Sequence, residues 1–128
     1  MGHVLVIEDD PDTAEAMQRL LRRRGHNADV LNGGTRALHW LDSNPPAPDV
    51  VVLDWMMPDM DGGQVLQLLK SHPAYRHLKV IVFSGAFDHD RISEARRLGA
   101  ADYLVKGTVS WTTVLEKVET LIRGGHAA

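Results

Sequence analysis

The chain contains no cysteine, no long apolar run and no strong excess of charge of either sign. The lack of cysteine excludes disulfide bonds, thiolate catalysis and cysteine-based zinc sites. No apolar segment approaches the roughly 20 residues that cross a bilayer, and none is long enough for a signal-peptide core, so we expect a cytoplasmic protein without membrane contact. A net charge of −3 gives no electrostatic reason to expect direct nucleic-acid binding.

The length of 128 residues fits a single domain. We expect this domain to span residues 1–123 and the last residues, 124–128, to form a flexible tail, because "GGHAA" adds nothing to a core. The seven histidines include no His-x-x-x-His pair, which indicates surface or core positions rather than metal ligands.

Short runs rich in Val, Ile and Leu alternate along the chain with helical patterns, and three of the runs are apolar throughout, as in strands covered on both faces. Five strands alternating with five helices predict right-handed crossovers and a parallel sheet with helices on both faces, which is the doubly wound α/β class. The predicted strands are 3–8, 27–31, 49–54, 79–84 and 101–105, and the predicted helices are 11–24, 35–43, 63–71, 88–98 and 111–122.

Polar side chains stand where the predicted strands end. In a doubly wound sheet, ligands bind outside the carboxyl ends of the strands, so the site is expected there. Neither a GxGxxG fingerprint nor a GxxxxGK[ST] loop follows the first strand, which disfavours dinucleotide and Walker-type sites. The residues at the strand ends are Glu8, Asp9 and Asp10 after the first strand, Asp54 after the third, Ser84 after the fourth and Lys106 after the fifth.

This combination of carboxylates, a hydroxyl and a lysine favours phosphoryl chemistry. Clustered carboxylates repel one another, and Mg²⁺ relieves the repulsion because it prefers hard oxygen ligands and phosphate oxygens. A carboxylate beside Mg²⁺ can act as a nucleophile, while the lysine and the hydroxyl offset charge on the transferred group. Each residue also has a simpler interpretation: Asp10 as a helix N-cap, Asp54 as the start of a turn and Lys106 as a solvated lysine.

Four motifs, in the right order and spacing, carry a family resemblance: "VLVIEDDPDTA", "VVLDWMMPDMDGG", "VIVFSGA" and "GAADYLVKG". From His3 to about Arg123 the sequence resembles the receiver domain of two-component response regulators, with 30 residues from Asp54 to Ser84 and 22 from Ser84 to Lys106. The resemblance implies a flavodoxin-like receiver fold with strand order 2-1-3-4-5.

The resemblance also implies a role for each site residue. Asp54 would be the phosphoacceptor. A Mg²⁺ ion would bind Asp9 and Asp54 directly, Glu8 through water and the backbone carbonyl of Met56. Ser84 and Lys106 would contact the phosphoryl group, and the rotamer of Tyr103 would report the switch.

The implied function is a phosphorylation-operated signalling switch rather than an enzyme. A sensor histidine kinase or phosphotransfer protein would donate the phosphoryl group. Residues 88–122 would form the surface that binds a downstream effector protein. No effector domain fits in the chain, so output by protein binding is expected unless the residues were excised from a longer protein, and homodimerisation stays open.

Two rival functions share parts of this pattern. A haloacid-dehalogenase-type phosphatase also uses an aspartyl nucleophile after a strand, but it needs a second Asp two residues later as acid/base, where this chain has Met56. A pseudo-receiver scaffold would fold alike without phosphorylation, and the presence of the full set of site residues argues against it.

Residues around the site add further expectations. Lys106 is followed by Gly107, where receivers usually carry a proline joined through a cis peptide. A cis bond before a residue other than proline costs about 3 to 4 kcal/mol, so we predict a trans Lys106–Gly107 bond and a rearranged, more mobile loop. We expect Met57 and Met60 to pack in the core or a turn, Pro58, Gly62 and Gly63 to shape the loop before the next helix, and Asp59 and Asp61 to be turn residues rather than metal ligands.

Overall fold

The computed structural model describes residues 2–124, which form a five-stranded parallel sheet in the order β2-β1-β3-β4-β5. This is the predicted doubly wound fold with the predicted strand order. The strands are β1 (His3–Ile7), β2 (Asn27–Leu31), β3 (Val50–Leu53), β4 (Lys79–Ser84) and β5 (Asp102–Val105). The helices are α1 (Pro11–Arg23), α2 (Gly34–Ser43), α3 (Gly62–Ser71), α4 (His89–Arg97) and α5 (Trp111–Ile122).

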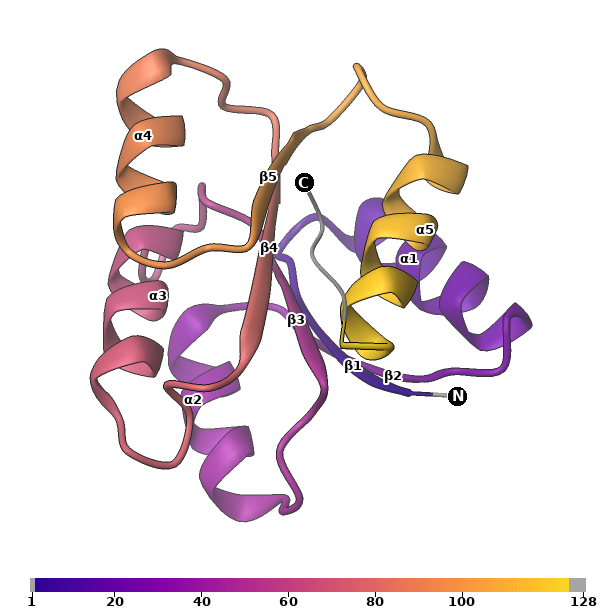
Figure 1. Ribbon diagram of the computed structural model, residues 1–128, viewed down its shortest axis with the longest axis horizontal. Helices are drawn as coiled ribbons and strands as arrows, with labels where there is room; N and C mark the ends of the chain where they lie inside the picture. The colour runs from indigo at the N-terminus through magenta and orange to yellow at the C-terminus, as the bar shows by residue number, and fades with distance from the viewer. Residues whose placement is uncertain (1, 125–128) are drawn as a thin grey trace.

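Helices cover both faces of the sheet. Figure 1 shows α1 and α5 on one side and α2, α3 and α4 on the other. Side chains alternate along each strand, so Val4 and Val6 of β1 pack towards α1 and α5, whereas Leu5 and Ile7 join the core on the other face. This two-sided burial explains why the central strands are apolar throughout.

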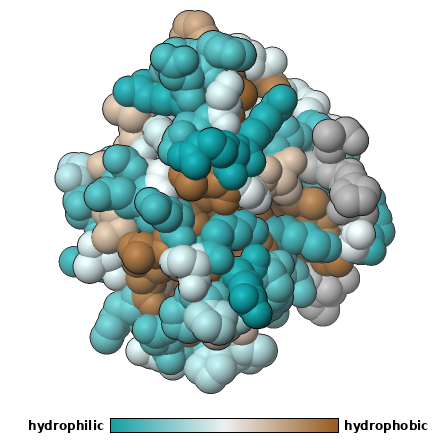
Figure 2. Space-filling model, turned by 60° about the vertical axis from the view of Figure 1, so that its left-hand side comes forward, coloured by the Kyte–Doolittle hydropathy of each residue, from teal (hydrophilic) through white to brown (hydrophobic). Residues whose placement is uncertain are grey.

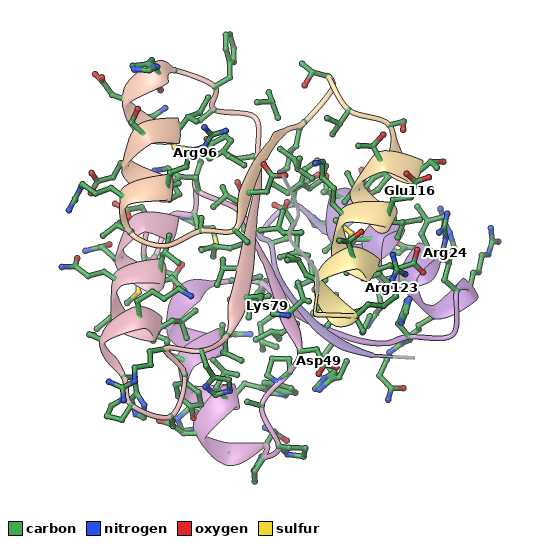
Figure 3. The ribbon with its side chains drawn as sticks, viewed as in Figure 1. Arg24, Asp49, Lys79, Arg96, Glu116 and Arg123 are labelled. Atoms are coloured by element: carbon green, nitrogen blue, oxygen red, sulfur yellow. The ribbon has the colours of Figure 1, made fainter. Side chains whose placement is uncertain are left out.

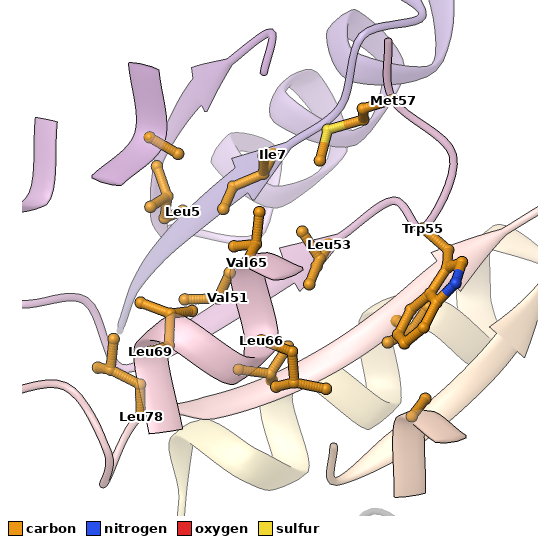
Figure 4. Close-up of a cluster of buried hydrophobic side chains, with 14 of the residues drawn as sticks. Leu5, Ile7, Val51, Leu53, Trp55, Met57, Val65, Leu66, Leu69 and Leu78 are labelled. Atoms are coloured by element: carbon orange, nitrogen blue, oxygen red, sulfur yellow. The ribbon is translucent and has the colours of Figure 1, made fainter. Parts of the chain in front are cut away.

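The core beneath α3 shows how the sheet and helices hold each other. Val65, Leu66 and Leu69 of α3 are fully buried and point towards Val51 and Leu53 of β3 (Figure 4). Each fully buried aliphatic side chain contributes roughly 1.5 to 3 kcal/mol relative to an exposed one. This packing fixes the end of β3, which Asp54 follows directly.

Side chains at the N-termini set most helix boundaries. Asp10 accepts a hydrogen bond from the Thr13 amide and caps α1, which confirms the N-cap interpretation of this residue. Asp61 forms a capping box with Gln64, and this cap starts α3 at Gly62. Gly62 and Gly63 therefore lie in the first turn of α3, which begins one residue before the predicted start at Gly63.

The C-terminal half of α5 is tied to three other parts of the fold. Lys79 of β4 donates to the Leu121 carbonyl oxygen at 2.8 Å, a favourable place for a cation at a helix C-terminus (Figure 3). Arg24, just after α1, lies 2.6 Å from the Glu119 carboxylate, and buried His26 lies 2.9 Å from its second oxygen. These contacts hold α5 against the α1–β2 connection.

Every predicted helix and strand is present, with each end within one residue of its predicted position. The basic residues Arg22 and Arg23 lie in the last turn of α1, and Arg24 is its C-cap. The predicted tail falls largely on residues 125–128, which lie outside the described residues. Among residues 2–124, no helix combines the length and apolar character needed to cross a membrane.

The α2–α4 side of the molecule is mostly polar at its surface. Figure 2 turns this side towards the viewer and shows small brown hydrophobic areas separated by teal side chains. Leu68 of α3 is an exposed apolar residue of this kind, with 46% of its surface accessible. Single exposed apolar side chains are common on soluble domains and need no partner to explain them.

Candidate functional site

A cluster of carboxylates lies where β1 and β3 end side by side. The Asp54 amide donates to the Ile7 carbonyl oxygen at 3.0 Å, which continues the β1–β3 ladder by one bond. Oxygen atoms of Glu8, Asp9 and Asp54 all lie within 4.8 Å of one another. Residues 46 positions apart in the chain are thus brought together by the register of two parallel strands.

Lys106 places a cation against this cluster. Its Nζ atom lies 2.7 Å from Glu8 Oε1 and 3.5 Å from Asp54 Oδ2. The Lys106 amide donates to the Ser84 carbonyl oxygen at 2.9 Å, so the end of β4 fixes the lysine backbone. The lysine therefore reaches Asp54 as predicted, but its tighter partner is Glu8.

Burial and the neighbouring charges shift the pKa values of two groups in the cluster. Burial raises the pKa of Glu8 from 4.5 to about 7, and the Asp54 carboxylate adds to this shift, while Lys106 opposes it. Burial alone would lower the pKa of Lys106, but the Glu8 hydrogen bond and the negative charge of Asp54 outweigh it, so the pKa is raised. Lys106 thus carries its positive charge into the site at neutral pH.

The Asp54 side chain also begins a turn. Its Oδ1 atom accepts a hydrogen bond from the Met56 amide at 3.2 Å, so the simpler interpretation of this residue holds alongside its place in the cluster. The chain then folds back so closely that the Gly62 amide donates to the Trp55 carbonyl oxygen at 2.8 Å. The Asp54 carboxylate is 94% buried at this turn.

Ser84 and Tyr103 meet at the backbone of the loop after β4. Ser84 is fully buried, and its Oγ atom accepts a hydrogen bond from the Ala86 amide at 3.3 Å. The Tyr103 hydroxyl donates to the Ala86 carbonyl oxygen, and burial raises the pKa of this tyrosine. Ser84 and Tyr103, the hydroxyl and the aromatic residue that the sequence suggested, therefore both form hydrogen bonds with the backbone of Ala86.

Two nearby aspartates serve helix ends and take no part in the cluster. Asp61 caps α3, and Asp59 accepts hydrogen bonds from the amides of Thr35 at 3.0 Å and Gly34 at 3.4 Å. Asp59 thus caps α2 from a distant loop, a role that the sequence analysis missed. The available signal was Gly33, because a glycine at the N-cap of α2 has no side chain that could cap the helix.

The structure also tests the remaining expectations for the loops. Met57 is buried and Met60 packs against the same core. Within residues 2–124 the single cis peptide bond joins Pro45 and Pro46, so the Lys106–Gly107 bond is trans as predicted. Gly107 has a φ of +85°, the left-handed conformation that glycine adopts without strain.

The carboxylate cluster suits a hard divalent cation. Glu8, Asp9 and Asp54 each offer one oxygen within a compact space, and Mg²⁺ prefers a few carboxylates together with water and phosphate oxygens. The donor set contains no nitrogen or sulfur ligand that would favour a softer metal. The residues present therefore fit a Mg²⁺ ion.

Comparisons with known sequences agree with this geometry. The family profile described as "Response regulator receiver domain" matches residues 4–118. The chain is 40% identical over 103 residues to the response regulator protein FleR of Pseudomonas aeruginosa, covering 80% of this chain and 21% of that protein. It is 32% identical over 124 residues to the transcriptional regulatory protein PcoR of Escherichia coli, covering 96% of this chain and 52% of PcoR. The chain thus spans about half or less of these relatives.

Solved structures show the same architecture. The receiver domain of the Francisella response regulator 1452 superposes with a TM-score of 0.87 at 29% identity, covering 97% of this chain and 98% of that one. The signal receiver domain of a signal transduction histidine kinase from Syntrophus aciditrophicus gives a TM-score of 0.87 at 27% identity, covering 97% and 92% of the two chains.

Proposed function

Because the chain belongs to the response regulator receiver domain family, a signalling family, we propose that it is a phosphorylation-operated switch whose phosphoacceptor is Asp54. The observation that carries the proposal is the position of the Asp54 carboxylate. It lies within 4.8 Å of Glu8 and Asp9 oxygens and 3.5 Å from the Lys106 amine. A nucleophilic carboxylate between a cation site and a fixed ammonium has what phosphoryl transfer requires.

Mg²⁺ would be held by Asp9, Asp54, the Met56 carbonyl oxygen and, through water, Glu8. When bound, the ion supplies charge neutralisation for the carboxylates and the incoming phosphoryl oxygens. The Asp54 turn keeps the carboxylate at the mouth of the sheet, because the Met56 amide holds one oxygen and leaves the other facing Lys106.

The transfer step breaks the P–N bond of a phosphohistidine and forms a P–O bond to an Asp54 oxygen. Lys106 would offset the negative charge on the phosphoryl oxygens, and the Ser84 hydroxyl would donate a hydrogen bond to one of them. Ser84 and Tyr103 both form hydrogen bonds with the backbone of Ala86. A movement of the Ser84 hydroxyl would therefore reach Tyr103 through Ala86. This contact supports the proposal that Tyr103 follows the phosphorylation state.

The partners follow from this function. The donor would be a sensor histidine kinase or a phosphotransfer protein, and residues 88–122 would bind an effector protein. PcoR is named as a transcriptional regulatory protein, but the chain covers only 52% of its length. We propose output through protein contacts of this domain, with no separate substrate turned over and, given its net charge of −3, no direct contact with nucleic acid. The cytoplasmic location stays a prediction.

Phosphorylation of Asp54 is tested by intact mass after incubation with acetyl phosphate and Mg²⁺. We expect the mass of one phosphoryl group in the wild type and in Asp59→Asn, and no gain in Asp54→Asn. Asp59 is a matched control because it lies in the same loop but caps α2. Labelling that persists in Asp54→Asn would refute the assignment, and an unlabelled wild type would favour the scaffold function.

Mg²⁺ should raise the melting temperature, because a ligand that binds only the folded state stabilises it by about 2.7 kcal/mol at 100 times its Kd. In Asp9→Asn we expect this response to be lost, since one of the three converging carboxylates is gone. Asp12→Asn is the control, because Asp12 is exposed in the first turn of α1. An Asp9→Asn protein that responds to Mg²⁺ like the wild type would place the ion elsewhere.

A further inference from the structure

Lys106 lies against an aromatic pair that the site chemistry does not use. The Lys106 Nζ atom lies 5.8 Å from the centroid of the Phe83 ring, within the range of a cation–π contact. The Phe83 ring packs in turn against Trp111, with 5.7 Å between centroids and 60° between planes. Phe83 is the residue before Ser84 at the end of β4, and Trp111 is the first residue of α5.

The Ser84 hydrogen bond fixes the Lys106 backbone, but it leaves the direction of the flexible four-carbon side chain to other contacts. Gly107 follows Lys106 directly, and a Cβ atom added to it would meet nothing within 4 Å, so the space on that side of its backbone is open. Glycine also has more accessible backbone conformations than any other residue. Other contacts must therefore restrict where the Lys106 side chain points.

The alternative to the observed position is a pocket beside the lysine. This pocket has a volume of about 270 Å³ and is lined by Phe83, Trp111, Lys106, Gly107 and Thr13, among others. A flexible four-carbon side chain could swing into such a space and away from Asp54. Phe83, which lines this pocket, is 94% buried. Trp111 is 36% exposed and packs against the Phe83 ring.

We propose that Phe83 and Trp111 are positioning residues for the phosphoryl transfer, an inference that rests on the proposed function of Asp54 and Lys106. The face of the Phe83 ring attracts the Lys106 ammonium and keeps it beside Glu8 and Asp54. Trp111 keeps the Phe83 ring in place and links this arrangement to the start of α5. The aromatic pair thereby provides rigidity that the Lys106–Gly107 loop lacks.

The test is the rate of Asp54 phosphorylation by acetyl phosphate at saturating Mg²⁺ in Phe83→Leu and Trp111→Leu. We expect the maximal rate to fall about five- to tenfold, equivalent to about 1 to 1.4 kcal/mol of transition-state stabilisation. The acetyl phosphate concentration at half-maximal rate should stay unchanged, because positioning acts on the transition state. Trp111→Phe, which keeps an aromatic ring against Phe83, should restore most of the rate.

The same substitutions made in a Lys106→Ala protein distinguish a positioning role from a packing role. In Lys106→Ala, where no ammonium remains to be held, we expect Phe83→Leu to cause no further loss of rate. Trp40→Leu is the control, since Trp40 is an aromatic of α2 that packs against His3 and should leave the rate unchanged. Melting curves of each variant verify that the domain is folded at the assay temperature.

Equal slowing by Phe83→Leu in the wild-type and Lys106→Ala backgrounds would overturn the inference, and so would a wild-type rate in both leucine variants. A wild-type protein that is never labelled would overturn the proposed function as well. Labelling with a rate that depends on Lys106 but not on Phe83 or Trp111 would remove the positioning role alone.

Discussion

Gly62→Ala should lower the melting temperature by about 4 to 10 °C, because overpacking of this kind costs roughly 1 to 3 kcal/mol. A Cβ atom at this position would lie 2.7 Å from the Asp54 carbonyl oxygen and 2.7 Å from the Trp55 Cα atom. Both are backbone neighbours that cannot rotate away. Alanine would otherwise favour the first turn of α3 by about 0.5 to 1 kcal/mol, so steric conflict must outweigh helix propensity.

The same substitution should slow Asp54 phosphorylation by at least about tenfold, since small displacements of reacting groups have large effects on rate. Gly85→Ala is the matched control for stability, because a Cβ atom there would meet nothing within 4 Å. Thermal unfolding and labelling by acetyl phosphate measure the two effects. A Gly62→Ala protein as stable and as active as the wild type would show that the β3–α3 connection does not need this close approach.

The stability of the protein without Mg²⁺ should fall as pH rises from about 4.5 to about 7. Glu8 has a pKa near 7 in the folded state against 4.5 for an ordinary glutamate, so the folded state binds the proton more tightly. A raised folded-state pKa stabilises the protein fully below the unfolded value, and this contribution disappears as pH passes the folded value. Burial and the Asp54 charge are the physical cause.

Glu8→Gln should therefore behave like the wild type near pH 4.5 and be more stable near pH 8, with EDTA present in both cases. Addition of Mg²⁺ at pH 8 should stabilise the wild type far more than the variant, because one carboxylate of the cluster is lost. Glu15→Gln, on the exposed face of α1, is the control. Parallel stability–pH curves for wild type and Glu8→Gln would contradict the raised pKa.

The fold was predictable because its local signals agree with one another. Pro11 and Gly25 mark the two ends of α1, and the continuous apolar run at residues 50–53 indicates a strand buried on both faces. The convergence of Asp54 and Lys106 was predictable because parallel strands place their carboxyl ends at one edge of the sheet. Periodicity and strand order thus sufficed to predict the backbone and the place where the candidate site residues meet.

Contacts that side chains make with residues far away in the chain could not be predicted from the sequence. The stronger pairing of Lys106 with Glu8 depends on how a flexible side chain is held, and the cap that Asp59 gives α2 joins residues 24 positions apart. Neither leaves a periodic signal. The contact of Phe83 with Trp111 was hidden in the same way, because the pattern of α5 explains Trp111 as one residue of an apolar stripe.

Reduction of the phosphorylated protein with borohydride tests the central claim most directly. Borohydride converts an acyl phosphate of aspartate to homoserine, which marks the modified residue permanently for peptide mass spectrometry. After treatment with acetyl phosphate and Mg²⁺, we predict homoserine at position 54 and aspartate retained at positions 9, 59 and 61. Homoserine at any of those three positions with aspartate intact at 54, or a phosphoryl group that resists borohydride, would contradict the account.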